Sequence, residues 1–139
     1  MKKEHIILIA DRNPNVRKLL KRELENEGYL IRMAKNSREV LYWSYHHEFA
    51  DILILDPDLP GFEEFPEIQK LKNRIPPLPV VIHALQSDYS KKFYNSNLLF
   101  FVEKSRESIR YLKQVIADIL YKSINTHKKT MYKNISLDQ

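Results

Sequence analysis

The chain has 139 residues, of which 43% are hydrophobic and 29% are charged, a balance typical of a folded domain and unlike that of disordered or fibrous proteins. It contains no cysteine, which excludes disulfides, cysteine-ligated zinc or iron–sulfur centres and thiol nucleophiles. No apolar run approaches the roughly 20 residues of a membrane span, and none resembles a signal peptide. We therefore expect one cytoplasmic domain that binds no membrane.

The net charge is +5, and it is unevenly spread. Residues 121–139 hold four lysines and one aspartate, so they carry +3 of it. A second basic cluster has no acid among its members and is either a solvated helix face or a docking surface for an acidic partner. Its members are Arg12, Arg17, Lys18, Lys21 and Arg22.

Short apolar runs alternate with amphipathic segments along the chain. The runs are continuous, which is typical of strands buried on both faces. They cover residues 5–10, 51–55, 79–84 and 98–102, with a weaker edge-strand candidate at 29–34 that a charged residue interrupts.

Helix signals lie between these runs. Asn13 and Pro14 favour a helix start, and Gly28 favours its stop. Asn36 and Glu39 resemble a capping box for a second helix that runs to about residue 48. Further helices are expected over residues 63–73 and 87–96 and, capped by a serine, over residues 105–120.

This alternation through five units predicts an α/β fold: a doubly wound, parallel five-stranded sheet with helices on both faces. The apolar periodicity stops after about residue 122. We therefore predict a domain of residues 1–123 and a mobile basic tail of residues 124–139.

Four charged residues follow the predicted strands. Asp11 comes after the first strand, Asp56 and Asp58 after the third, and Lys104 after the last. In an open α/β sheet, sites form outside the carboxyl ends of the strands. Each residue alone fits a capping or surface role, but together they favour a site.

The motifs ILIADRNPNVRKLL, DILILDPDLPG, PPLPVVIHA and FFVEKS occur in this order. They resemble those of CheY-like receiver domains, the response-regulator domains of two-component phosphorelays, over about residues 5–121. The resemblance implies a flavodoxin-like sheet with strand order 2-1-3-4-5. It also implies a histidine kinase or phosphotransfer protein as partner.

The resemblance assigns roles to the charged residues. Asp56 matches the phospho-acceptor, whose carboxylate attacks the phosphodonor, and Lys104 matches the lysine that contacts the phosphoryl group. Mg²⁺ would bridge acceptor and phosphoryl oxygens. Its ligands would be Asp11, Asp56 and the backbone carbonyl of Asp58.

Arg12 departs from the family pattern, because it stands where a second acidic metal ligand is expected. A guanidinium is always charged and only donates hydrogen bonds. Asp11, Asp56, Arg12 and Lys104 together carry two negative and two positive charges, so the pocket can neutralise itself without metal. Arg12 either pairs with Asp56 or extends into solvent.

Two switch positions also bear on function. Ala84 lies where the family has a serine or threonine hydroxyl that follows the phosphoryl group, and alanine has none. Phe101 matches the aromatic switch position, and its lack of a hydroxyl is a tolerated variant. A one-residue error in register would place His83 rather than Ala84 at the hydroxyl position, and its side chain would not reproduce the usual contact either. Otherwise His83 is expected to be a structural strand residue.

Loss of a metal ligand and of the switch hydroxyl favours a degenerate, stand-alone receiver that acts by protein–protein interaction and has no output domain. The alternative is a functional receiver phosphorylated on Asp56 by a histidine kinase. In both readings the chain is no enzyme beyond self-catalysed phosphoryl transfer. A third reading, in which DPDLP starts a haloacid dehalogenase-like phosphotransferase, lacks the later motifs of those enzymes.

The resemblance also implies where a target would dock. Receivers commonly use the face formed by the fourth helix, fifth strand and fifth helix for targets or dimers. Leu99 and Phe100 add apolar side chains there, which predicts a contact with a target or a second copy. The alternative is that they lengthen the buried strand. Too few residues follow residue 122 for a DNA-binding domain.

Overall fold

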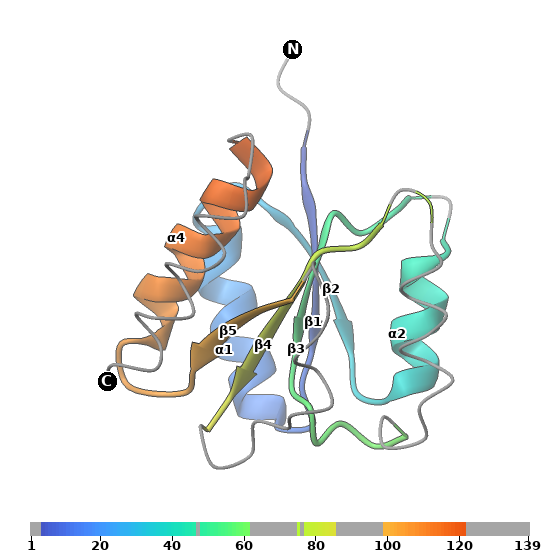
Figure 1. Cartoon of the computed structure of the whole chain (residues 1–139), viewed down its shortest axis with the longest axis horizontal. Coiled ribbons are helices and arrows are strands. Elements are labelled where there is room, and N and C mark those ends of the chain that lie inside the picture. Colours follow the sequence, from blue (N-terminus) through green and yellow to red (C-terminus); the bar gives the residue numbers. More distant parts are fainter. Residues whose placement is uncertain (1–3, 47, 62–74, 76, 86–98, 122–139) are drawn as a thin grey trace.

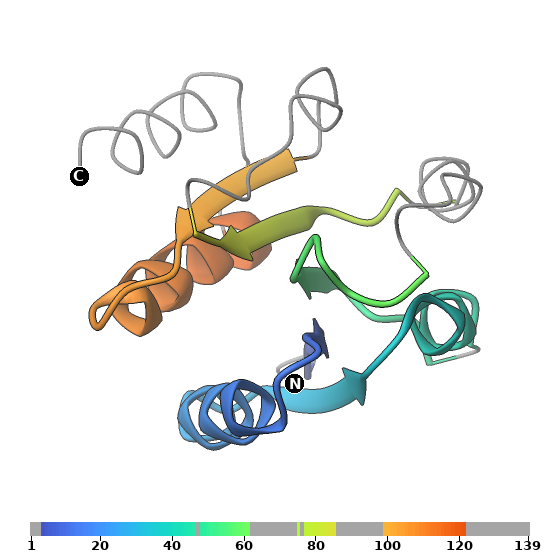
Figure 2. The ribbon, with the colours of Figure 1, turned by 90° about the horizontal axis from the view of Figure 1, so that it is seen from below.

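The structure is a computed structural model, and it describes residues 4–46, 48–61, 75, 77–85 and 99–121. Five parallel strands form one sheet in the order β2-β1-β3-β4-β5 (Figure 2), which confirms the predicted order. Each strand begins one residue after the start of its predicted run. The strands are β1 (Ile6–Ala10), β2 (Leu30–Ala34), β3 (Ile52–Leu55), β4 (Val80–Ala84) and β5 (Leu99–Glu103).

Helices cover both faces of the sheet, as predicted. Helices α1 (Pro14–Glu25) and α4 (Ser108–Tyr121) lie on one face and α2 (Ser37–Ser44) on the other (Figure 1). Successive strand residues point to opposite faces, so the central strands, which read as unbroken apolar runs, supply two cores. Ile7, Ile9 and Ile54 pack toward α1 and α4, whereas Leu8 and Leu55 pack toward α2.

The helix starts agree with their capping signals better than the ends do. The Asn13 side chain accepts the backbone N–H of Asn15 at 2.8 Å, and the Asn36 side chain accepts that of Glu39 at 2.9 Å. Helix α2 ends at Ser44, about four residues before the predicted end. The Ser44 hydroxyl donates to the Val40 carbonyl at 2.7 Å, a bond that competes with regular helix geometry.

The connection from β5 to α4 also differs from the prediction. Ser105 accepts the backbone N–H of Glu107 on its hydroxyl at 3.2 Å and that of Ser108 on its carbonyl at 3.2 Å. These bonds form a turn, and the helix itself begins at Ser108. Ser105 therefore precedes the helix by a turn.

Several predicted segments lie outside the described residues: the helices at 63–73 and 87–96 and the tail at 124–139. Of the helices that the structure does describe, none combines the length and the apolar character needed to cross a membrane.

Candidate functional site

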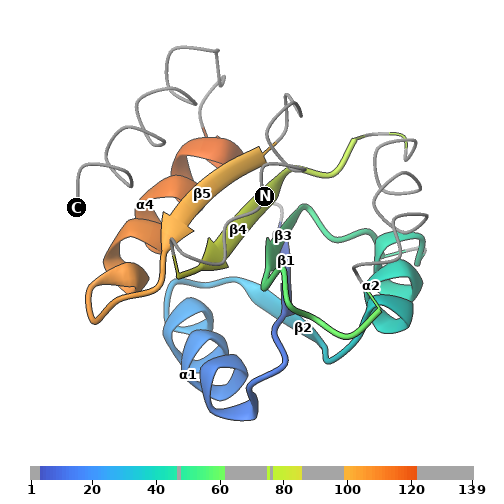
Figure 3. The same ribbon diagram turned by 60° about the horizontal axis from the view of Figure 1, so that its bottom comes forward.

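Three side chains lie in one row at the carboxyl ends of neighbouring strands. Ala10 lies opposite Leu55, and Leu55 lies opposite Ile82. The next residues are therefore Asp11, Asp56 and His83, which continue the row across β1, β3 and β4. Each lies two residues after a strand residue that packs toward α1 and α4, namely Ile9, Ile54 and Val81. Because strand side chains alternate between the two faces, Asp11, Asp56 and His83 share that face of the sheet. Figure 3 shows α1 leaving the end of β1 on this side.

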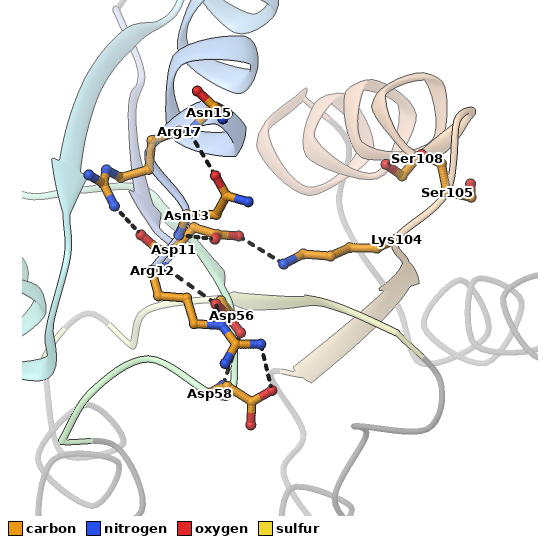
Figure 4. Close-up of polar contacts among 10 residues, drawn as sticks. All are labelled: Asp11, Arg12, Asn13, Asn15, Arg17, Asp56, Asp58, Lys104, Ser105 and Ser108. Carbon is orange, nitrogen blue, oxygen red and sulfur yellow. Dashed lines mark hydrogen bonds and ion pairs between the residues drawn. The ribbon is translucent and has the colours of Figure 1, made fainter.

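Lys104 joins the row from the edge strand. It follows β5, and its backbone N–H donates to the Ala84 carbonyl at 2.8 Å. Its Nζ lies 3.1 Å from Oδ2 of Asp11 (Figure 4). The ammonium thus neutralises a carboxylate that is almost fully buried.

Backbone geometry holds Asp11 in place. Its Oδ1 accepts the N–H of Asn13 at 2.8 Å, and its carbonyl accepts the Arg17 guanidinium at 2.6 Å. Burial raises the pKa of Asp11 above its ordinary value, and the Asn13 N–H and the charge of Lys104 oppose that rise. The same turn that caps α1 therefore fixes the first carboxylate of the site.

Arg12 lies between two aspartates (Figure 4). Its Nε is 3.4 Å from Oδ2 of Asp56, and its Nη2 is 3.3 Å from Oδ2 of Asp58. The Arg12 side chain is 55% exposed, whereas that of Asp56 is 2% exposed. The sequence left two placements open for Arg12, an ion pair with Asp56 or extension into solvent. The structure shows the ion pair.

Both oxygens of Asp56 receive donors. Its Oδ1 accepts the N–H of Asp58 at 2.9 Å, and its Oδ2 accepts the N–H of Arg12 at 3.3 Å in addition to the guanidinium. A buried carboxylate is stable only with such partners. The predicted acceptor is therefore satisfied entirely by its own chain.

This arrangement does not fit Mg²⁺, which the family resemblance implies. Mg²⁺ needs an octahedral set of oxygen ligands, but a guanidinium, which has no acceptor atom, occupies the space between Asp56 and Asp58. Among the described residues, no group of three or more histidine, aspartate or glutamate side chains is placed to hold a metal ion.

The switch positions are buried on the opposite face of the sheet. Ala84 and Phe101 belong to the core under α2. Ala84 presents only a methyl group there, so no hydroxyl follows the acceptor from this position. Phe101 packs as a core residue.

His83 is the site residue whose position sequence reasoning missed. It was expected to be structural, and it is indeed buried, with 4% exposed. Neither ring nitrogen has a hydrogen-bond partner within the part of the chain that the structure describes. Burial and, to a smaller extent, the charge of Lys104 lower the pKa of His83 to about 3, and Asp56 opposes this shift. The alternation along β4 indicates which face His83 shares, but its place beside Asp56 depends on the register between β3 and β4.

The expected contact role of Phe100 is wrong. Its side chain is 2% exposed and packs in the core under α1 and α4, because the run that suggested surplus apolar surface forms a strand covered on that face. The alternative, a lengthened buried strand, is correct for Phe100. Leu99 begins β5, and the fourth helix that would complete the predicted face lies outside the described residues.

Fold and site together define a class of protein. A doubly wound five-stranded sheet with aspartates after β1 and β3 and a lysine after β5 has the architecture of a phospho-acceptor signalling domain. The family model "Response regulator receiver domain" matches residues 7–117, and the chain belongs to this family.

Curated relatives share the receiver part. The response regulator GtcR of Aneurinibacillus migulanus is 34% identical over 93 residues, which cover 66% of this chain and 37% of GtcR. The DNA-binding transcriptional regulator NtrC of Bradyrhizobium sp. is 29% identical over 83 residues, which cover 60% of this chain and 17% of NtrC. The chain thus spans well under half of the length of these relatives.

Solved structures agree. A putative response regulator from Chloroflexus aurantiacus has a TM-score of 0.71 at 27% identity, over 86% of this chain and 100% of that one. The response regulator TrrA of Thermotoga maritima, solved in complex with Mg²⁺ and BeF, has a TM-score of 0.67 at 28% identity, over 84% and 99%. TrrA is also known in complex with the histidine kinase ThkA.

Proposed function

We propose that this receiver domain is degenerate: its metal-dependent phosphorylation is impaired, and it signals in the cytoplasm by protein–protein interaction. The observation that carries the proposal is the Arg12 guanidinium, held between Asp56 and Asp58 at 3.4 and 3.3 Å. It provides the neutralising charge that a divalent cation supplies in a receiver.

The chemistry of acceptor phosphorylation explains the impairment. An aspartate that attacks a phosphodonor brings two anions together, so it needs a cation that binds both. Arg12 repels that cation: two unit charges about 4 Å apart interact by roughly 4 kcal/mol at an effective dielectric of 20. The Nε of Arg12 also lies 3.4 Å from Oδ2 of Asp56, one of the two possible nucleophilic atoms.

The partner in this proposal is a histidine kinase or a phosphotransfer protein, supported by the complex that TrrA forms with ThkA. Contact with a target or a second copy through the α4 and β5 side, including Leu99, remains part of the proposal. Phe100 does not contribute a contact side chain there.

A specific observation supports the alternative, a functional receiver phosphorylated on Asp56. The pair of Asp11 and Lys104 is intact at 3.1 Å, and Asp56 lies at the end of β3, where the family has its acceptor. If Arg12 swung outward, these residues would regain most of a receiver site.

Calorimetric titration with Mg²⁺ separates the two functions. We expect no measurable binding by the wild-type chain at millimolar Mg²⁺ and binding at least tenfold tighter by Arg12→Asp, because the change removes a cation and adds a ligand. Arg22→Asp is the matched control: it makes the same charge change on α1 at an exposed position and should bind as the wild type does. Equal affinity of the wild type and Arg12→Asp would contradict the proposal.

A further inference from the structure

The outer edge of the sheet carries an aromatic surface that the site does not use. Strand β2 lies at the end of the sheet order, with α1 and α2 on either side of it (Figure 2). Its register with β1 is complete over all five residues, and no other strand that the structure describes pairs with its outer side. An unprotected edge strand is a ready site for contact with another chain.

Side chains from β2 and α2 form this surface together. Trp43 on α2 lies beneath the Arg32 guanidinium, whose carbon is 5.3 Å from the ring centroid. Tyr42 meets Trp43 edge to face at 5.0 Å, and it is 59% exposed, as large as any aromatic exposure in the described part of the chain. Leu30 is 38% exposed at the start of β2. Glu48, which follows α2 in the chain, pairs with Arg32. We call Leu30, Arg32, Tyr42, Trp43 and Glu48 the β2–α2 surface.

The composition of this surface is that of a protein interface. Tryptophan, tyrosine and arginine are the residues most enriched among those that carry binding energy. A rigid aromatic pair loses little side-chain entropy when it is covered. The contacts between Arg32, Trp43 and Tyr42 hold these side chains in place before any partner arrives.

The distribution of charge favours a second copy of this chain as the partner that covers the surface. The chain as a whole carries +5, so two copies repel each other wherever basic residues predominate, as they do along α1. The β2–α2 surface is locally balanced, because Arg32 and Glu48 form an ion pair at 3.4 Å. Glu48 is 56% exposed, so its carboxylate can form the same ion pair with an arginine of another chain.

We propose that a second copy of this chain docks on the β2–α2 surface. In a twofold dimer each surface meets its own equivalent, so Arg32 of one copy can pair with Glu48 of the other, and the Tyr42 and Trp43 rings of both copies are covered. The surface has five residues, against the roughly 20 to 30 residues a side of a stable interface. The dimer is therefore weak and depends on protein concentration.

Intrinsic tryptophan fluorescence reports association at this surface. Trp43 is the only tryptophan of the chain, so a blue shift of the intrinsic fluorescence on concentration reports burial of this surface. Sedimentation equilibrium measures the mass over the same concentration series. We expect the average mass to rise from one chain toward two, with a parallel shift in Trp43 emission.

Two exposed substitutions test the location. Tyr42→Glu should weaken association at least tenfold without affecting folding. Leu19→Glu is the matched control, since Leu19 is an exposed apolar residue on α1 and should leave association unchanged.

A charge exchange between two variants is the sharpest test. Arg32→Glu and Glu48→Arg should each be monomeric alone, because each places like charges together. An equimolar mixture of the two should regain the wild-type mass, because every contact across the interface is then between opposite charges. Mixing the two variants cannot restore the ion pair between Arg32 and Glu48 of one chain, so the rescue reports a contact between chains. A wild-type chain that stays monomeric at millimolar concentration, or a dimer that Tyr42→Glu leaves intact, would overturn the proposal.

Discussion

The two halves of the site each pair a buried carboxylate with a basic side chain, but they differ in how exposed that side chain is. In one half the carboxylate of Asp11 is paired with Lys104, whose side chain is 24% exposed. In the other half the carboxylate of Asp56 is paired with Arg12, whose side chain is more than half exposed. Each half places one buried anion against one cation, but only the first cation is enclosed.

The difference distinguishes an enclosed ion pair from an exposed one. The half with Asp11 and Lys104 ties the ends of β1 and β5 together. The half with Arg12 holds a guanidinium on a long side chain that also reaches Asp58. We infer that the first half maintains the fold, whereas the second determines whether the site takes a metal and a phosphoryl group.

Loss of Lys104 should have the largest effect. Lys104→Met leaves the buried Asp11 carboxylate without its cation, so we expect the free energy of unfolding to fall by about 2 to 3 kcal/mol. Urea denaturation measures it. Lys113→Met is the control, since Lys113 forms its ion pairs with Glu23 and Glu27 at the surface and should cost less than about 1 kcal/mol. Equal losses would show that Asp11 needs no enclosed partner.

His83, between the two halves, makes the fold sensitive to acid. Its pKa is about 3 in the folded state against 6.5 for an unperturbed histidine, so below about pH 6.5 the unfolded chain binds more protons and stability falls. The loss should reach about 2 kcal/mol between pH 7 and pH 5. The raised pKa of Asp11 acts in the opposite direction, because the folded chain then binds the extra proton.

Urea midpoints of the wild type and His83→Leu at pH 7 and pH 5 measure this contribution. The leucine fills a similar volume and cannot take a proton, so the variant should lose less stability on acidification. A pH dependence identical to that of the wild type would assign the acid sensitivity to other groups.

Loss of the Arg12 side chain should have the smallest effect on stability. Arg12→Gln keeps the backbone N–H that Asp56 accepts and removes an ion pair that solvent already screens, so we expect a loss of about 1 kcal/mol or less. The difference from the wild type should shrink in 1 M salt. A loss as large as that of Lys104→Met would mean that Arg12 is as structural as Lys104.

Much of the fold could be predicted from the sequence, because strand burial leaves a pattern that does not depend on distant contacts. All five strands follow from the apolar runs, whereas their order was implied by the resemblance to receiver domains. The end of α2 at Ser44 could not be predicted, since it depends on a local hydroxyl bond to Val40 that competes with helix continuation.

The site was only partly predictable. The positions of Asp11, Asp56 and Lys104 follow from strand ends, but the placement of Arg12 depends on the rotamers of a long side chain. Phe100 was misjudged because a strand edge and a strand interior read alike in one sequence. The neighbourhood of His83 requires the register between β3 and β4, which the sequence does not state.

Intact mass spectrometry after incubation with acetyl phosphate and Mg²⁺ tests the central claim most directly. We predict that the wild-type chain stays unmodified, whereas Arg12→Asp gains one phosphoryl group that the further change Asp56→Asn removes. Rapid, stoichiometric addition of one phosphoryl group to the wild type, abolished by Asp56→Asn, would contradict the account and make this chain a functional receiver.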